Sequence, residues 1–157
     1  PEAGPEVDWL IRLVSGIRAT RSVLNVPAGA RLTLNVRDAG PPTLERLRRH
    51  EAAIRRPAGI DSIRSGEAST EGAAQIVVDE ATFILPLQGV IDLEAEKSRL
   101  TKSLEAAAKE RDSLAQRLGN PSFVERAKPE AVEKARSDHA DKTAEAERLK
   151  AGLARLG

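Results

Sequence analysis

Few side chains in this sequence are suited to catalysis. The 157-residue chain contains no Cys and only two His, His50 and His139, which lie far apart in sequence with no carboxylate pattern around either. Disulfides, thiolate metal sites and cysteine nucleophiles are therefore excluded, and we expect no catalytic, cofactor-binding or metal-binding residue in the chain. Aromatic residues make up 2% of the sequence, which is too few rings for a platform on which nucleic-acid bases stack.

Arginine is the residue type here that is best suited to binding a ligand. Residues 7–65 carry eleven Arg against five acidic residues, whereas residues 66–92 carry five acidic residues and no basic one. A guanidinium group matches phosphate with two parallel hydrogen bonds, so this excess suits an anionic partner. A GC-rich coding sequence would produce the same Arg excess, and composition alone leaves both explanations open.

The spacing of apolar residues predicts an α+β fold in three parts. The first part is an N-terminal helix that ends near Asn25, because a Pro and a Gly follow. A helix this apolar needs neighbours, which we expect upstream in a longer protein. Arg12, Arg18 and Arg21 lie off its apolar face. That face is predicted to consist of Val7, Leu10, Ile11, Val14 and Ile17, continued by Val23 or Leu24.

The second part, residues 30–92, is predicted to be a small α/β unit. Alternating polar and apolar residues predict half-buried strands, two of which form an antiparallel pair. One helix, from Thr43 to the breaking residues Pro57 and Gly59, separates the first two strands. Only about 60 residues are available, so the core is expected to be small. The predicted strands are residues 31–36, residues 60–64 and the pair 75–78 with 82–85.

The third part, residues 93–157, is predicted to be a long antiparallel two-helix coiled-coil hairpin. Two heptad runs of about 26 residues, each about 39 Å long as a helix, are separated by a short break and must fold back on each other. Gly119 is expected to end the first helix in the left-handed conformation, and Asn120 to cap a short helix that begins at Pro121. Pro129 then starts the returning helix. The predicted apolar seam consists of Leu93, Leu100, Leu104, Ala107, Leu114 and Leu118, followed by Val132, Ala135, Ala146, Leu149, Leu153 and Leu156.

Four basic side chains interrupt this seam, namely Lys97, Arg111, His139 and Lys142. A two-helix hairpin leaves one side of its seam open, so that long basic side chains can extend along it to water. Alternatively, these groups line a face presented to phosphate. The sequence leaves both interpretations open.

The chain contains no apolar run near the roughly 20 residues of a membrane span, and no signal peptide opens it. It begins with Pro1 and contains no Met. We therefore interpret the sequence as a piece of a longer cytoplasmic protein that does not contact a membrane.

Motifs at both ends of the chain resemble one known family, the bacterial valyl-tRNA synthetases. The beginning of the chain is similar to the last helix of their anticodon-binding helical domain, through Val7-Asp8-Trp9-Leu10-Ile11-Arg12, Ile17-Arg18, Arg21 and Asn25-Val26-Pro27-Ala28-Gly29. The end of the chain is similar to their C-terminal arm, through Leu87-Gln88-Gly89-Val90-Ile91-Asp92-Leu93, Glu96-Lys97, Leu100, Leu118, Asn120, Phe123, Val124, Ala127, Pro129 and Val132.

The resemblance implies three domains and a function. Residues 1–29 would end the anticodon-binding domain, residues 30–92 would form a connecting α/β domain, and residues 93–157 would form a coiled-coil arm that reaches the outer corner of tRNA. It implies a class I aminoacyl-tRNA synthetase, a monomeric ligase that uses ATP to attach valine to its tRNA. The family's His-Ile-Gly-His and Lys-Met-Ser-Lys-Ser signatures are absent from this sequence. We therefore expect this chain alone to be inactive, to need no cofactor, and to grip and position valine-specific tRNA.

The residues predicted to contact tRNA are basic and would bind phosphate with little reading of bases. They are Arg111, Arg117, Arg126 and Lys128 in the hairpin, and Arg12, Arg18 and Arg21 in the first helix. Phe123 would either fix the turn at the tip of the hairpin or stack on a base. The alternative function is a coiled-coil protein-interaction or ribosome-associated module unrelated to tRNA charging, which has no need of an Arg-lined first helix.

Overall fold

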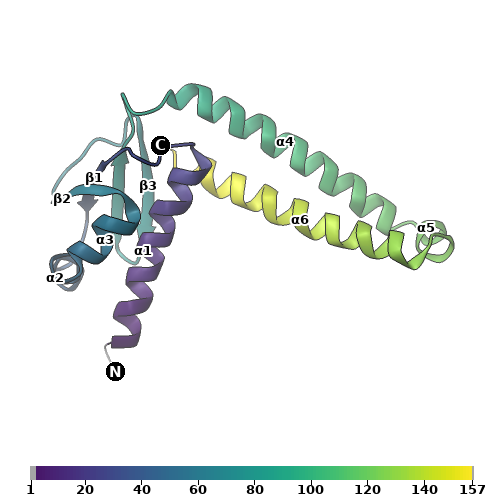
Figure 1. Cartoon of the computed structure of the whole chain (residues 1–157), viewed down its shortest axis with the longest axis horizontal. Coiled ribbons are helices and arrows are strands. Elements are labelled where there is room, and N and C mark those ends of the chain that lie inside the picture. Colours follow the sequence, from purple (N-terminus) through teal and green to yellow (C-terminus); the bar gives the residue numbers. More distant parts are fainter. Residues whose placement is uncertain (1–2, 157) are drawn as a thin grey trace. The chain divides into compact units, whose positions relative to one another are not determined.

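The computed structural model describes residues 3–156 of the chain. It divides into two compact units. We call residues up to Glu96, together with those from Ala154 onward, the sheet unit, and Lys97–Leu153 the hairpin unit. The predicted α+β class is confirmed (Figure 1). None of the helices in the described residues is long and apolar enough to span a lipid bilayer.

Four strands form one mixed sheet in the order β2-β1-β4-β3. Their bounds are β1 Leu32–Arg37, β2 Ile60–Ser65, β3 Ala73–Val78 and β4 Ala81–Pro86. The predicted antiparallel pair of strands is confirmed, because β3 and β4 pair antiparallel across a two-residue turn. Strand β4 also pairs antiparallel with β1, while β1 and β2 are parallel. Parallel neighbours need a crossover connection, and the segment between β1 and β2 supplies it.

Two short helices make up this crossover, α2 (Pro41–Arg49) and α3 (Glu51–Ala58). They differ from the single predicted helix in beginning at Pro41 and in being interrupted at His50. Pro57 does not break the helix, because it lies inside the last turn of α3. The helix ends at Gly59, as predicted, and the φ of 67° there is the left-handed conformation that glycine adopts without strain.

Helix α1 (Ala3–Val23) packs against β3 and α3. The predicted apolar face was wrong in its first half, since the side chains of Val7 and Ile11 are 51% and 57% exposed. The predicted positions Ile17 and Leu24 are fully buried. The neighbours that this helix needs thus include the sheet of its own chain. Its buried face consists of Trp9, Leu13, Ile17, Thr20 and Leu24.

Small residues on that face let the helix backbone approach the sheet. A Cβ atom added at Gly16 would lie 2.9 Å from Cγ2 of Ile76, closer than carbon atoms pack. The hydroxyl of Thr20 donates to the carbonyl of Gly16 at 2.7 Å, which satisfies it within the helix. Nearer the start of the helix, Trp9 meets Phe83 edge to face, with ring centroids 6.5 Å apart. These contacts make α1 an integral part of the sheet unit's core.

The end of the chain returns to the sheet unit. Leu156 was predicted to close the helical seam, but the helix ends at Ala154 and Leu156 forms an antiparallel bridge with Ala74 of β3. Beside it, the backbone N–H of Gln75 donates to the carbonyl of Arg155 at 2.7 Å. The heptad spacing extended past the end of the helix because Leu packs equally well in a helical seam and beside a strand.

The hairpin consists of α4 (Leu93–Leu118) and α6 (Pro129–Ala154), which run antiparallel side by side with the short helix α5 (Pro121–Arg126) at the turn (Figure 1). Each long helix has 26 residues, as the two heptad runs predicted. Two helices cover only one side of each other, so several seam leucines are half-buried. The buried seam side chains are Leu100, Ala107, Val132, Ala135, Ala146 and Leu149.

Candidate nucleic-acid interface

The tip of the hairpin is a capped turn. Asn120 has an extended backbone, and its side chain accepts a hydrogen bond from the N–H of Ser122 at 3.0 Å. Pro121 occupies the first position of α5, where no backbone donor is needed. Both of these predictions are confirmed. Gly119 differs from its prediction, because it does not have a positive φ and its N–H continues the helical pattern to Ala115.

Phe123 lies against the hairpin rather than projecting freely. Its ring is half-buried, and the guanidinium of Arg117 sits 5.8 Å from the ring centroid. A cation over an aromatic face is attracted by the ring's quadrupole. Because Arg117 covers one face of the ring, this arrangement favours Phe123 as the residue that fixes the tip turn over Phe123 as a base-stacking group.

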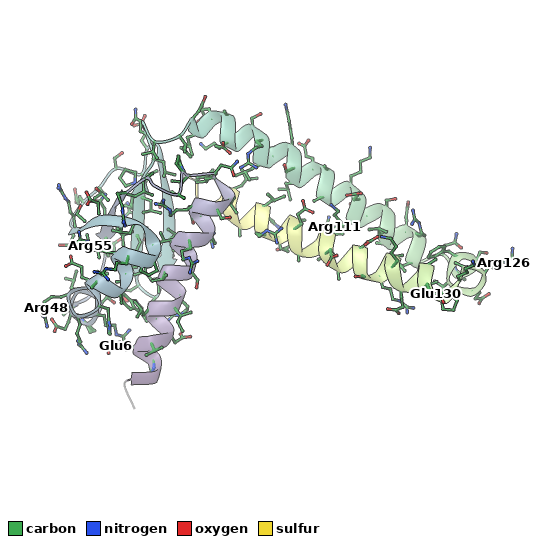
Figure 2. All side chains as sticks on the ribbon, in the orientation of Figure 1. Glu6, Arg48, Arg55, Arg111, Arg126 and Glu130 are labelled. Carbon is green, nitrogen blue, oxygen red and sulfur yellow. The ribbon has the colours of Figure 1, made fainter. Side chains whose placement is uncertain are left out.

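The four basic residues predicted at the tip have different surroundings. Arg126 and Lys128 are exposed, and neither forms an ion pair with any described residue. Arg111 is half-buried and donates to the carboxylate of Asp112 at 3.1 Å. Figure 2 shows Arg126 at the tip and Arg111 farther back along the hairpin. The tip therefore presents two unpaired cations, and Arg111 and Arg117 stand behind them with contacts of their own.

The polar seam residue with the clearest role is Lys142. Its ammonium lies 3.1 Å from Glu110 on the facing helix and 3.0 Å from Glu145 one turn along its own helix. Hydrogen bonds to these two carboxylates raise the pKa of Lys142 above its ordinary value. This pairing favours the structural interpretation of the seam lysine over phosphate binding.

A hollow of about 540 Å³ on the side of the hairpin is mostly acidic. Arg117 and Lys142 are its only basic lining residues among those described. Four carboxylates would repel a phosphate backbone there. The hairpin therefore has a side that is unsuited to nucleic acid. The acidic lining residues are Glu110, Asp138, Asp141 and Glu145.

The three arginines of α1 that were predicted to contact tRNA lie in different surroundings. Arg12 donates to Asp8 one turn earlier and to Asp79 in the β3–β4 turn, each at 2.9 Å. Arg21 is half-buried and donates to three backbone carbonyls, at Pro27 (3.0 Å), Ala30 (2.8 Å) and Gly59 (3.4 Å). Both are thus engaged within the chain. Arg18 is exposed and forms no ion pair with a described residue.

The Arg12–Asp79 pair predicts a small acid dependence of stability. Hydrogen bonds from Arg12 lower the pKa of Asp79 below its usual value. A lowered carboxyl pKa stabilises the fold above the unfolded-state pKa, about 3.9, and this stabilisation is lost as the pH falls through the folded-state value. Asp79→Asn should therefore lower the melting temperature slightly at pH 7. The difference from wild type should shrink as the pH falls below about 4.

The choice of Asn controls for backbone strain, because residue 79 has a φ of 55° and Asn, like Asp, adopts this conformation readily. Both partners are about half exposed, so the effect at pH 7 is expected to be only a few degrees. Thermal melts of wild type and variant across this pH range measure it. A difference that persists unchanged at pH 2 would show that the ion pair is not its cause.

Three arginines that sequence reasoning did not select lie close to Arg18 and Arg21. Arg31 and Arg56 line a hollow together with them, and Arg55 lines the adjoining one. The available signal was the Arg excess of residues 7–65, but the sequence does not show which of those residues have carboxylate partners. Among the described residues, no group of His, Cys, Asp or Glu side chains is arranged to hold a metal ion.

Comparison with known proteins gives consistent matches. Residues 92–157 match the family described as the valyl tRNA synthetase tRNA binding arm. All 157 residues align with a valine–tRNA ligase from Rhizorhabdus wittichii at 62% identity, covering 17% of that protein. The valine–tRNA ligase of Sphingopyxis alaskensis is 54% identical over 99% of this chain, covering 16% of that protein. That of Zymomonas mobilis is 50% identical over 96% of the chain, covering 17%.

The chain thus spans about a sixth of the length of these relatives. The matches confirm the resemblance carried by the motifs at its two ends, and they extend through residues 30–92, where no motif is distinctive. The long helical hairpin with its capped tip lies within the segment matched by the family's arm. The chain belongs to the valyl-tRNA synthetase family, and its residues 92–157 form that family's tRNA binding arm.

Proposed function

We propose that this chain is the tRNA-gripping part of a bacterial valine–tRNA ligase, a class I synthetase that attaches valine to its tRNA using ATP. The observation that carries this proposal is the match of residues 92–157 to a tRNA binding arm whose tip presents Arg126 and Lys128 unpaired. Valine activation and ATP binding belong to the rest of the longer protein, which acts as a monomer in the cytoplasm. The present chain supplies grip and placement of valine-specific tRNA.

The hairpin's chemistry supports recognition of shape and phosphate. Its exposed groups are mainly charged side chains, and its one aromatic ring is covered on one face by Arg117. Folded RNA offers backbone phosphates to such a surface, while base edges are read mostly in splayed loops. We therefore expect this chain alone to bind folded tRNA much more strongly than unstructured RNA, and to bind different tRNAs with similar affinity.

A binding assay of the 157-residue chain tests the proposal. Valine tRNA should bind, a second tRNA should bind within about threefold of it, and an unstructured RNA of equal length should bind at least about tenfold more weakly at roughly 0.1 M salt. The same sample should show no ATP–pyrophosphate exchange. Absence of tRNA binding, or equal binding of unstructured RNA, would contradict the proposal, and so would detectable exchange by the pure chain.

A further inference from the structure

Two adjoining hollows on the sheet unit are lined by arginines. The first, of about 430 Å³, has Arg18, Arg21, Arg31 and Arg56 in its wall together with the Ser22 hydroxyl, and no acidic side chain among its described lining residues. The second, of about 470 Å³, shares two of these arginines and adds Arg55 and one acid, Asp61. We call Arg18, Arg31, Arg55 and Arg56 the arginine surface.

The arginine surface differs from most other arginines of the sheet unit in its ion pairing. Five other arginines of this unit are paired with carboxylates, whereas Arg64 and Arg155 also have no carboxylate partner among the described residues but do not line the two hollows. Within residues 3–156, no member of the arginine surface forms an ion pair, although all four are exposed. Figure 2 shows Arg55 on α3 and Arg48, which is paired with Glu45, on α2. The paired arginines are Arg12, Arg37, Arg46, Arg48 and Arg49.

Arg21 holds in place the backbone segments that carry the arginine surface. Its three hydrogen bonds tie the loop after α1 to the junction of α3 and β2. At that junction Gly59 has a φ of 67°, which favours glycine, and a Cβ atom there would lie 3.0 Å from the Arg21 guanidinium. Burial and the nearby charge of Arg31 lower the pKa of Arg21. Like charges are therefore held together on a fixed backbone, an arrangement that an anion would stabilise.

The chemistry of the lining specifies the anion. Among the described lining residues there is no aromatic ring on which a base or an adenine could stack. Guanidinium groups and a hydroxyl match phosphate oxygens instead. Because two hollows share Arg31 and Arg56, the surface extends farther than one phosphate and suits successive phosphates of a backbone.

We propose that Arg18, Arg31, Arg55 and Arg56 form a second contact with the phosphate backbone of tRNA, on the sheet unit and in addition to the hairpin tip. The inference rests on the proposed function, because it takes the same tRNA as the ligand. It assigns to residues 30–92 an RNA-binding role beyond that of a connection. Arg21 is the positioning residue of this surface.

Charge-matched variants of the 157-residue chain test the surface. Arg31→Gln/Arg56→Gln removes two of its guanidiniums and keeps the fixing residue Arg21. The control, Arg37→Gln/Arg48→Gln, removes two arginines of the same unit that are paired with Asp38 and Glu45. We expect the surface variant to bind valine tRNA about tenfold more weakly near 0.1 M salt, with its log–log salt slope reduced by about two. The control should stay within about twofold of wild type.

The outcomes separate this inference from the proposed function. A wild-type chain that does not bind tRNA contradicts both. If wild type binds and a tip variant, Arg126→Gln/Lys128→Gln, is weakened while the surface variant matches its control, the inference alone is overturned. Circular dichroism of each variant checks folding, and Arg31→Lys/Arg56→Lys, which keeps charge but loses the fork geometry, should fall between wild type and the Gln variant.

Inorganic phosphate distinguishes an RNA backbone from a free anion. If the surface binds RNA through several phosphates, phosphate at a few millimolar should displace tRNA no better than an equal ionic strength of chloride. Displacement by phosphate well beyond the chloride effect, absent in the surface variant, would assign the hollows to a small anion and overturn the RNA assignment.

Discussion

Replacing Arg111, Arg117, Arg126 and Lys128 by Ala in the full-length protein is expected to weaken tRNA binding by about a hundredfold near 0.1 M salt and to raise the apparent KM for tRNA. Each lost phosphate contact also removes about one counterion from the release that drives binding, so the salt dependence should become shallower. Valine activation, measured by ATP–pyrophosphate exchange, should be unchanged, because that step needs no contact at the arm.

The structure predicts how this effect divides among the four residues. Arg126 and Lys128 are exposed and unpaired among the described residues, whereas Arg111 contacts Asp112 and Arg117 contacts the Phe123 ring. The double variant Arg126→Ala/Lys128→Ala should therefore produce most of the loss. Equal salt slopes for the fourfold variant and wild type would show that these residues do not touch phosphate, and would move the contact to Arg18 and the rest of the arginine surface.

A matched control lies on the same hairpin. Lys134 and Arg136 are exposed residues of α6 that pair with Asp138 at 2.9 Å and Glu133 at 3.1 Å. Lys134→Ala/Arg136→Ala removes the same net charge as the tip double variant. The two cations that it removes are paired with carboxylates and lie on α6 rather than in the tip turn. We expect its tRNA affinity to stay within about twofold of wild type. An equal loss in both double variants would mean that tRNA responds to net charge rather than to the tip.

Phe83→Ala is expected to destabilise the sheet unit strongly while leaving the hairpin helical. Phe83 is fully buried on β4, where it meets the Trp9 ring edge to face. Truncating a buried Phe to Ala removes about 3–5 kcal/mol, a large share of the roughly 5–15 kcal/mol that stabilises a small domain. The hairpin unit is compact by itself, so the loss should not spread to it.

Circular dichroism measures the two units separately. The near-ultraviolet signal of Trp9, the only Trp in the chain, should be lost at a much lower temperature than in wild type. Most of the far-ultraviolet helical signal should remain at that temperature and should not depend on protein concentration. The control Val77→Ala truncates an apolar side chain that is 70% exposed on β3, and should change the melting temperature little. A single transition in which sheet and helices melt together in wild type and variant would contradict the independence of the units.

The spacing of apolar residues and the residue types at turns predicted most of the fold. The four strands and the two 26-residue helices followed from alternation and from heptads, and the Asn120 cap followed from its neighbour Pro121. These features depend on residues that are close in sequence, so one chain suffices to read them. Gly119 and Leu156 were misread because an alternative local solution, a continued helical bond and a strand bridge, was equally available to them.

The face of α1 could not be predicted, because the helix is apolar on two sides. One apolar side, with Val7 and Ile11, is exposed in the structure. The buried side carries Gly16, which has no side chain and therefore permits close approach to Ile76. Average hydrophobicity does not register that fit, since packing depends on shape as well as on polarity.

The candidate site was limited in the same way by contacts distant in sequence. Arg12 and Arg18 look alike in the sequence, yet Arg12 meets Asp79, 67 residues away, and Arg18 has no such partner among the described residues. Arg21 looked like a ligand-binding residue but holds three backbone carbonyls. Distinguishing a paired from an unpaired guanidinium requires the tertiary structure.

The bridge between Ala74 and Leu156 bears on how the protein avoids aggregation. Strand β3 reads Ala-Ala-Gln-Ile-Val-Val, an uncharged stretch without Pro at one side of the sheet. Such segments recruit strands from other molecules when their backbone donors and acceptors are open. Arg155 and Leu156 occupy part of that edge. The residues that follow helix α6 thus cover part of the sheet edge, and a chain cut before Arg155 would be expected to aggregate more readily.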